Sequence, residues 1–323
     1  KKKKKATRNS VKNMLFKDFI SNCKERDTTN YNKKVWVDYN TLTKHFTDED
    51  IPGRICEEWK NFDTSNLHRV SWALPDYAEE NASLKKEVVH KNCIVFVDGI
   101  YNPALSNIED KNGMNIIPLE EYINHNEEAK NFIYNSPLKY SENRLSGKKD
   151  TKSTTLLSIN TILNTGIAVI IDSKKVLKES VKILHLTTKK STFLNPYILI
   201  ICNNASSANL IDISNNDDNN WINPFYEFYV KEKANLSFSA LQANTLDNFT
   251  TGSLNFHVYK DAKVQISMFN RENSKKDIRV FLKEKGSNVE INGLLVSSKD
   301  KVSDIFCKVV HLAKDTKSNQ NWR

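Results

Sequence analysis

The chain has 323 residues and a mass of 37.2 kDa, which is enough for one large β domain or two ordinary domains with a full hydrophobic core. Hydrophobic residues make up 39% of the chain and the mean hydropathy is −0.57. The longest apolar run spans about six residues, so we expect no membrane span. The formal net charge is +9, and Lys1–Lys5 contribute five of these charges. A run this short is typical of a solvated tail, so we expect no nucleic-acid partner.

Cysteine usage points to a reducing compartment. The five cysteines form no CxxC pair, and their odd, sparse distribution disfavours a disulfide framework. His311 follows Cys307 by four residues, which places both on one face of a helix or a strand. These two are the candidate metal ligands, and a buried structural role for Cys307 is the alternative. We predict no metal site from this pair alone.

The sequence lacks the common catalytic and cofactor-binding motifs. Its eight glycines never form GxGxxG or GxxxxGK, so no phosphate-binding loop is predicted. HExxH, GxSxG and EF-hand patterns are also missing. We therefore predict neither catalytic nor cofactor-binding residues.

Residues 1–92 are predicted to form a polar tail followed by a small helical region. Apolar residues recur at helical spacing in Val11–Arg26 and at four-residue steps in Asp48–Phe62. The Trp and Phe residues of these segments are expected to be core contacts.

β structure is predicted from residue 93 onward. In Cys93–Ser106 a β-branched and aromatic run is interrupted by Asp98-Gly99, a strong hairpin signal. The polar segment Lys139–Thr155 predicts a long loop. Short strands are then expected at Ile167–Ile171, Val181–Thr188, Tyr197–Cys202 and Ala208–Ile213. No long amphipathic helix separates them, which disfavours doubly wound and TIM-barrel folds.

Three later segments resemble one another: KANLSFSALQ from Lys233, DAKVQISMFN from Asp261 and GSNVEINGLL from Gly286. Each places a small residue before an alternating strand, and the spacings of 28 and 25 residues are typical of a solenoid. We therefore predict a mainly β fold, a right-handed parallel β-helix over residues 93–323, with a β-sandwich as the alternative. The Asn- and Asp-rich insert Ile213–Pro224 is predicted to be a corner loop.

The segment Ile291–Arg323 resembles the SufB/SufD family. The matching residues are Gly293, Asp304, His311, Ser318, Gln320 and Arg323. Phe96–Ser106 resembles the hairpin that opens the SufD body, and Pro196–Ile213 and Glu227–Gln242 also fit. The similarity covers Cys93–Arg323 and is greater to SufD than to SufB, because N-terminal helices lead into the hairpin. Tyr197 departs from the pattern, since many relatives have a basic residue there.

The resemblance implies a non-catalytic scaffold subunit of the SUF system, which assembles iron–sulfur clusters. It would pair with a SufB-type paralogue and a SufC-type ABC ATPase, with a homodimer as the substitute in isolation. ATP hydrolysis would reside in the SufC partner, which agrees with the missing phosphate loop here. This chain alone would bind no cofactor, while the SufBCD complex would carry a transient cluster. The resemblance allows a reduced flavin in that complex but does not require one.

Family members also continue past the position of Arg323 into a further β segment, a Cys-x-His-Gly segment with a cluster-holding His, and helices that dock SufC. For that reason no cluster ligand is assigned to His311.

The functional alternative is a carbohydrate-active β-helix enzyme, a polysaccharide lyase or hydrolase. Such an enzyme needs carboxylates or basic side chains in one column across successive coils. The repeats place Asn235, Lys263 and Asn288 in comparable positions, which indicates polar corners instead. The chain has 40 Lys and 40 Asn residues, a bias that we attribute to AT-rich coding. Together with the resemblance, this composition favours a plastid of the apicoplast type, with the targeting segment upstream. A bacterial cytoplasm is the alternative location.

Overall fold

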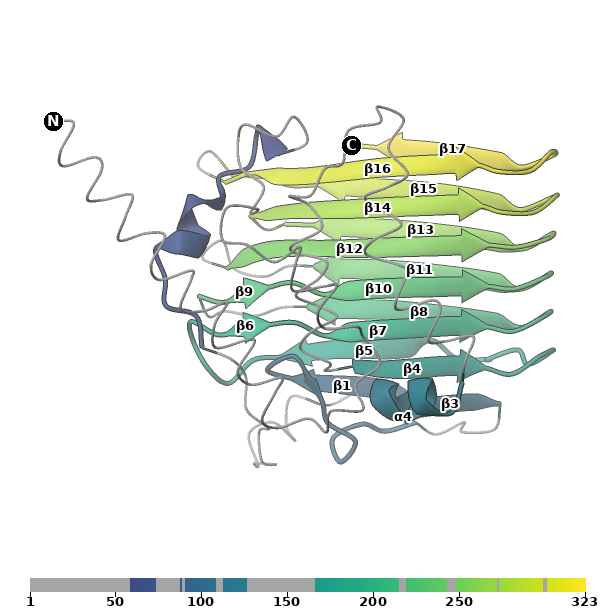
Figure 1. The fold of residues 1–323 in the computed structure, drawn as a ribbon, viewed down its shortest axis with the longest axis horizontal. Helices are drawn as coiled ribbons and strands as arrows, with labels where there is room; N and C mark the ends of the chain where they lie inside the picture. The colour runs from purple at the N-terminus through teal and green to yellow at the C-terminus, as the bar shows by residue number, and fades with distance from the viewer. Residues whose placement is uncertain are drawn as a thin grey trace, which may run out of the picture.

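The computed structural model describes residues 59–73, 88, 91–108, 113–126, 166–214, 219–242, 248–271, 273–298 and 301–323. In these ranges the chain forms a parallel β-helix that climbs coil by coil along one axis (Figure 1). The predicted mainly β, parallel β-helix fold is therefore confirmed. The predicted helix Val11–Arg26 and loop Lys139–Thr155 lie outside the described residues, as does most of Asp48–Phe62.

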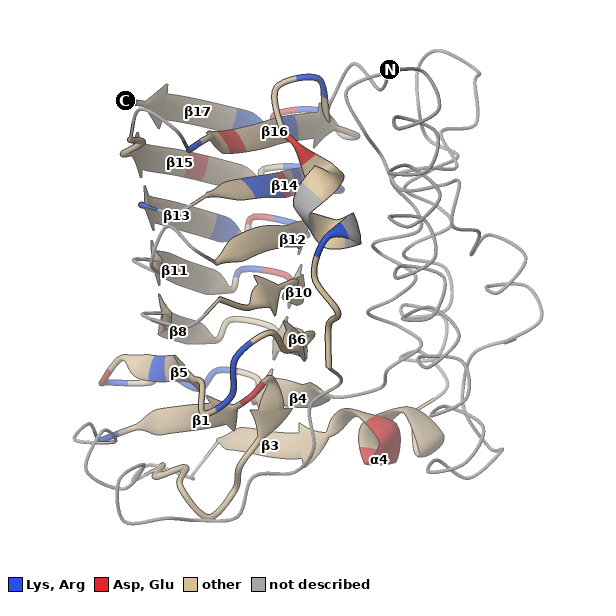
Figure 2. Ribbon diagram, turned by 90° about the vertical axis from the view of Figure 1, so that its left-hand side faces the viewer, with Lys and Arg blue, Asp and Glu red and all other residues tan. Residues whose placement is uncertain are grey.

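Each coil contributes one strand to each of two sheets, which form two walls of the solenoid (Figure 2). The eight-stranded sheet contains, in spatial order, β17 (Lys317–Trp322), β15 (Asn288–Leu295), β13 (Lys263–Asn270), β11 (Asn235–Gln242), β8 (Ser207–Ser214), β5 (Val181–Leu186), β1 (Cys93–Val97) and β2 (Ile100–Tyr101). The nine-stranded sheet contains β16 (Ser303–His311), β14 (Ser274–Leu282), β12 (Phe249–Val258), β10 (Phe225–Val230), β7 (Tyr197–Cys202), β4 (Gly166–Ile171) and β3 (Met114–Pro118). Its two remaining strands are the short β6 (Phe193–Leu194) and β9 (Trp221–Ile222).

Helical structure is scarce in the described residues. It consists of a 3₁₀ turn, η2 (Thr64–His68), and one short helix, α4 (Leu119–Asn124). In these ranges no helix has the length and apolar character needed to cross a membrane. The predicted division of the chain at residue 92 stays a prediction.

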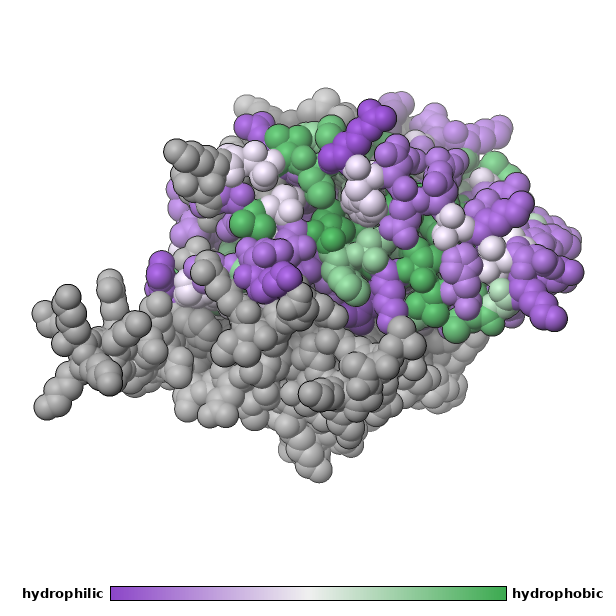
Figure 3. Space-filling view, turned by 90° about the horizontal axis from the view of Figure 1, so that it is seen from above, coloured by the Kyte–Doolittle hydropathy of each residue, from purple (hydrophilic) through white to green (hydrophobic). Residues whose placement is uncertain are grey.

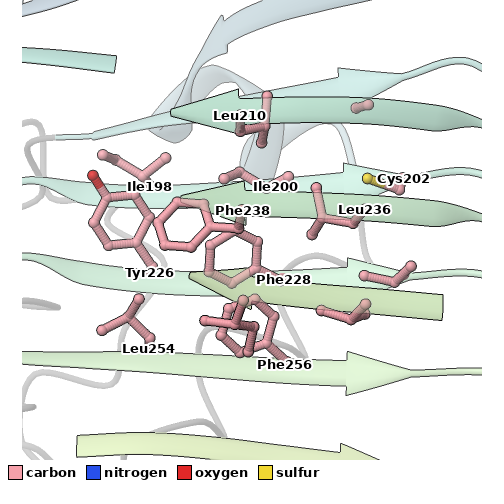
Figure 4. Close-up of a cluster of buried hydrophobic side chains, with 14 of the residues drawn as sticks. Ile198, Ile200, Cys202, Leu210, Tyr226, Phe228, Leu236, Phe238, Leu254 and Phe256 are labelled. Atoms are coloured by element: carbon pink, nitrogen blue, oxygen red, sulfur yellow. The ribbon is translucent and has the colours of Figure 1, made fainter. Parts of the chain in front are cut away.

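The interior of the solenoid is one apolar cluster built from inward-facing residues of both sheets. In β8, β11 and β13 buried and less buried residues alternate, because successive side chains of a strand point to opposite faces. Inward-facing residues of neighbouring coils therefore stack on residues of similar character. Phe228 and Phe256 lie 4.1 Å apart with their rings 3° from parallel, and Phe238 packs against both (Figure 4).

The predicted hairpin and strands are present. Asp98 and Gly99 have φ values of 50° and 78°, and they join the antiparallel strands β1 and β2. This pair of positive φ angles is what a type I′ turn requires. The four short strands expected after residue 155 correspond to β4, β5, β7 and β8.

The predicted repeats lie in register in the eight-stranded sheet, where Lys263 pairs with both Asn235 and Asn288. Before the eight-stranded sheet each coil turns through one residue in the left-handed region, with φ between 54° and 74°: Lys174, Ala205, Lys233, Asp261, Gly286 and Asp315. The Ala205 N–H donates to the Glu232 carbonyl of the next coil (2.8 Å). A small residue with 0% exposure follows in four coils: Ser206, Ala234, Ala262 and Ser287.

The predicted corner loop Ile213–Pro224 needs a correction. Its residue Ile213 belongs to β8, and Trp221 belongs to β9, where it is fully buried with its ring 4.3 Å from Phe193. Burial of the large apolar surface of Trp221 holds this part of the insert in the nine-stranded sheet, where β9 pairs with β6 and β12.

Asparagines stack at the same corner and cap backbone groups of neighbouring coils. Asn220 Oδ1 accepts the Thr192 N–H (2.9 Å), and Asn248 Oδ1 accepts the Asn220 N–H (2.9 Å). Part of the asparagine content therefore has a structural reason, because a short amide can satisfy a turn's backbone donors.

Candidate functional site at the last coil

The last described coil, formed by β16, β17 and the turn between them, lies at one end of both sheets in the described part of the chain. Among the described residues β16 pairs with β14 alone and β17 with β15 alone. Every residue of the two strands is half-buried or exposed. Viewed onto this end, apolar side chains lie between polar ones (Figure 3).

The hydrogen bonds of β17 define which backbone groups face outward. The N–H groups of Lys317 and Arg323 donate to the carbonyls of Ser287 (3.0 Å) and Gly293 (2.9 Å). Because alternate residues of a parallel strand bond to opposite neighbours, the backbone of Gln320 faces the open side. An edge of this kind is a template for pairing with a further strand.

Gly293 and Trp322 pack together at this end. The two residues are in register on β15 and β17, and a Cβ at position 293 would lie 2.1 Å from Cε3 of Trp322. The indole N–H donates to Gln320 Oε1 (3.3 Å), and the ring packs against the interior cluster. The glycine thus makes room for the indole that partly covers the end of the interior.

His311 closes the corner between β16 and β17. Its Nδ1 lies 2.7 Å from Thr316 Oγ1, and its Nε2 lies 3.0 Å from Ser318 Oγ. Thr316 also donates to the Ala313 carbonyl (3.2 Å). Both ring nitrogens are therefore engaged by hydroxyl groups of the following turn.

The candidate pair Cys307 and His311 is not brought together. Both residues lie in β16, and four steps along an extended strand separate Cα atoms by about 13 Å, too far for one metal ion. Cys307 packs against the interior, and burial raises the pKa of its thiol to about 11. In the described part of the chain no three His, Cys, Asp or Glu side chains form a group that could hold a metal.

The other two motif residues lie on different sheets. The Asp304 carboxylate is 3.7 Å from the Lys275 ammonium, on the outer face of the nine-stranded sheet. The Arg323 carbonyl accepts the Leu295 N–H (2.8 Å), and this hydrogen bond lies at the end of the pairing between β17 and β15. Asp304 and His311 therefore lie in β16, whereas Gly293, Ser318 and Gln320 lie in the eight-stranded sheet and Arg323 directly follows β17.

Sequence reasoning missed a chain of polar side chains inside the solenoid. Asp212 Oδ1 accepts the hydroxyl of Tyr226 (2.9 Å) and lies 2.8 Å from His185 Nε2, while Asp212 Oδ2 accepts Gln242 Nε2 (3.2 Å). Burial, together with the neighbouring Asp212 carboxylate, raises the pKa of Tyr226 well above its ordinary value. Its hydroxyl is therefore a permanent donor.

The same chain continues upward to the last coil. The Lys276 ammonium, which is 1% exposed, donates to Gln242 Oε1 and to Asn270 Oδ1 (2.6 Å). Asn270 Nδ2 then donates to Ser274 Oγ (2.8 Å) and to Ser303 Oγ. Gln242 thus links a buried anion, Asp212, to a buried cation, Lys276. The sequence signal for this chain of side chains was the presence of polar residues at inward-facing positions of alternating strands.

A second group missed by sequence reasoning lies on the outer face of the nine-stranded sheet. Glu227 Oε1 lies 2.7 Å from His257 Nε2 and accepts the Tyr229 hydroxyl (3.1 Å). The imidazole stacks on Tyr229 at 4.6 Å and on Phe281 at 5.2 Å. Burial lowers the pKa of His257; Glu227 opposes this effect, and Lys283 and Lys231 add to it. At neutral pH this histidine is therefore uncharged.

Residues 185–323 match a family model described as SUF system FeS cluster assembly, SufBD core domain. The matched span runs from the end of β5 through the last coil, and it contains the six motif residues and the interior polar chain. No curated protein matches the chain.

Over these residues, which make up less than half of the chain, the protein is similar to the SufBD core domain, and this similarity supports a part in SUF iron–sulfur cluster assembly. This family is a non-enzymatic, scaffold-type component of the SUF system and implies a complex with other subunits.

Proposed function

We propose that this chain is a SufD-type scaffold subunit that pairs with a SufB-type paralogue in the SUF complex. The observation that carries the proposal is the last described coil, where no described strand pairs with the outer edges of β16 and β17, inside the span that matches the SufBD core domain. A second solenoid can continue both sheets at once, because its strands supply the missing backbone partners.

In this arrangement the chain contributes surface and geometry, while a SufC-type ABC ATPase supplies the energy. The sequence has no phosphate-binding glycine loop, which is consistent with hydrolysis on another subunit. The cluster would be held transiently by the assembled complex, in which a reduced flavin would also bind, and this chain would hold neither by itself. Without its partner the same edges favour a homodimer.

The cellular location that we propose is a plastid of the apicoplast type. Its support is the Lys- and Asn-rich composition combined with the family match. Imaging of the full-length protein fused to a fluorescent tag tests this, and a cytosolic signal would contradict it.

The enzyme alternative has less support. Carboxylates and basic groups do gather on the nine-stranded sheet, where Arg279 donates to Asp277 (3.1 Å) near Glu227. These three residues are at most 8% exposed, however, so a polysaccharide cannot reach them. The cluster therefore acts in packing.

The proposed interface can be tested with a matched pair of variants at one position. Gln320→Pro removes an open-edge N–H, whereas Gln320→Ala keeps it, and neither removes a hydrogen bond to β15. We expect Gln320→Pro to weaken binding to an immobilised SufB-type protein at least tenfold and Gln320→Ala to bind like the wild type. Equal binding by both variants, with unchanged circular dichroism, would refute pairing through this edge.

A further inference from the structure

Residues 59–73, which we name the strap, run along the axis of the solenoid instead of winding with its coils (Figure 1). The lower end of the strap is fixed to the coil that contains β6. There the Ala73 N–H donates to the Ser191 carbonyl (2.9 Å), and the Ala73 carbonyl accepts the Phe193 N–H (2.9 Å). This end is therefore held by backbone hydrogen bonds of the kind that join neighbouring strands.

Buried aromatic side chains anchor the strap to the next two coils. The ring of Trp72 lies 6.0 Å from that of Trp221 in β9, and the ring of Phe62 lies 5.0 Å from that of Phe249 in β12. Both strap residues are at most 6% exposed. In a solenoid each coil contacts only its neighbours, so a segment that crosses several coils adds contacts of longer range.

The upper end of the strap meets a buried lysine of β14. Lys275 is 2% exposed, and its ammonium lies 5.8 Å from the ring centre of Trp59 in the strap and 5.7 Å from that of Phe306 in β16. The same ammonium is 3.4 Å from the Asp277 carboxylate and 3.7 Å from the Asp304 carboxylate, which is also in β16. An ammonium is attracted to aromatic faces more strongly when it is desolvated. One lysine thus joins the strap to the last described coil.

We propose that the strap and β16 form one cooperative unit, which opens and closes as a whole while the coils below stay folded. Departure of the strap takes the Trp59 ring from Lys275 and admits water, which weakens the attraction of the ammonium to Asp304 and Phe306. Every residue of β16 is half-buried or exposed, as expected for a segment of low local stability.

This unit gives the strap control over the order of β16. If a partner pairs with that strand, strap closure and partner binding favour each other, because the coupling between two sites is reciprocal. This consequence rests on the proposed function. The cooperative unit itself does not, and it is tested on the chain without a partner.

Hydrogen–deuterium exchange of the full chain, followed by mass spectrometry, tests the unit. Trp72→Ala removes the ring that contacts Trp221, three coils below β16. We expect exchange to rise about fivefold or more both in residues 59–73 and in Ser303–His311, while Gly166–Ile171 exchanges as in the wild type. A rise confined to the strap would overturn the proposal, because the strap would then open without β16.

Ile198→Ala is the control for lost stability in general, because Ile198 belongs to the interior cluster of the lower coils. We expect it to lower the free energy of unfolding without raising exchange selectively in the strap and β16. A selective rise as large as that of Trp72→Ala would overturn the proposal.

Lys275→Met tests the link itself. The thioether chain keeps the apolar stem between the two rings but removes the ammonium. We expect exchange to rise in both the strap and β16, and Lys263→Met, at an exposed lysine of the eight-stranded sheet, to change neither. A rise in β16 with an unchanged strap, or an equal rise from Lys263→Met, would overturn the role of Lys275 as the link.

Discussion

The indole of Trp322 occupies the volume that a side chain at position 293 would need. A Cβ on Gly293 would lie 2.1 Å from Cε3 and 2.2 Å from Cζ3 of the ring. Because Trp322 is on the last strand and packs against the interior cluster, this contact sets how the end of the solenoid is covered. Its loss should alter the end surface before it alters the coils below.

Gly293→Ala should displace the indole and lower the free energy of unfolding by about 1–2 kcal/mol, the usual cost of overpacking. Chemical denaturation followed by tryptophan emission measures both effects. In a Trp322→Ala background the same substitution should cost almost nothing. An equal cost in both backgrounds would show that Gly293 is required for another reason.

Lys276→Met should lower the free energy of unfolding by about 2–3 kcal/mol, because it leaves the amide oxygens of Gln242 and Asn270 buried without their donor. Urea denaturation of Lys276→Met, Gln242→Leu and the double variant gives the coupling. We expect the lysine substitution to cost less once Gln242 is replaced. A Lys276→Met variant as stable as the wild type would mean that the ammonium contributes no net stability.

The stability of the fold should fall on acidification in part through His257. Its folded pKa is lowered by burial, so below the unfolded value of about 6.5 the unfolded state binds more protons and the free energy of unfolding decreases. His257→Gln should remove this contribution, which is at most about 1.4 kcal/mol per pH unit. Denaturation curves measured from pH 7.5 to pH 5, in steps of about half a pH unit, test this. Parallel pH profiles for the wild type and the variant would contradict it.

Ala205 has a φ of 58° at an exposed corner, a conformation that costs a residue with a Cβ about 1 kcal/mol. Ala205→Gly should therefore leave stability unchanged or raise it by about 0.5 kcal/mol, after the added freedom of the unfolded chain is included. The matched control is Ala234→Gly in the next coil, where the alanine is fully buried, and it should destabilise by about 1 kcal/mol. A loss at Ala205 as large as that at Ala234 would refute the backbone argument.

The eight-stranded sheet could be predicted from the sequence because its inner and outer faces differ. Polar Asn235 and Lys263 are the first residues of their strands and are exposed, and each follows a fully buried alanine. The same turn and the same alternation of buried and exposed residues therefore recur in both coils. The nine-stranded sheet was harder to predict. Its strands are buried on both faces, as in β7 and β10, and Lys275 and Asp277 lie in one of them, so no simple alternation marks it.

The candidate site could be predicted only in part, through the family resemblance. That resemblance pointed to the last coil, where His311 and Ser318 lie, and to Gly293 in the neighbouring strand β15. Sequence spacing alone does not reveal that Cys307 and His311, the two candidate ligands, lie about 13 Å apart along one extended strand. The interior chain joins residues 30 and 34 positions apart, which only the stacking of coils brings into contact.

The most direct test of the scaffold proposal is light scattering on a sizing column with this chain and a purified SufB-type protein, with and without a SufC-type ATPase. We predict a one-to-one complex with the SufB-type protein even without the ATPase, and loss of that complex for Gln320→Pro. Two separate peaks for the wild-type chain and the SufB-type protein, in the presence of the ATPase as well, would contradict the proposal.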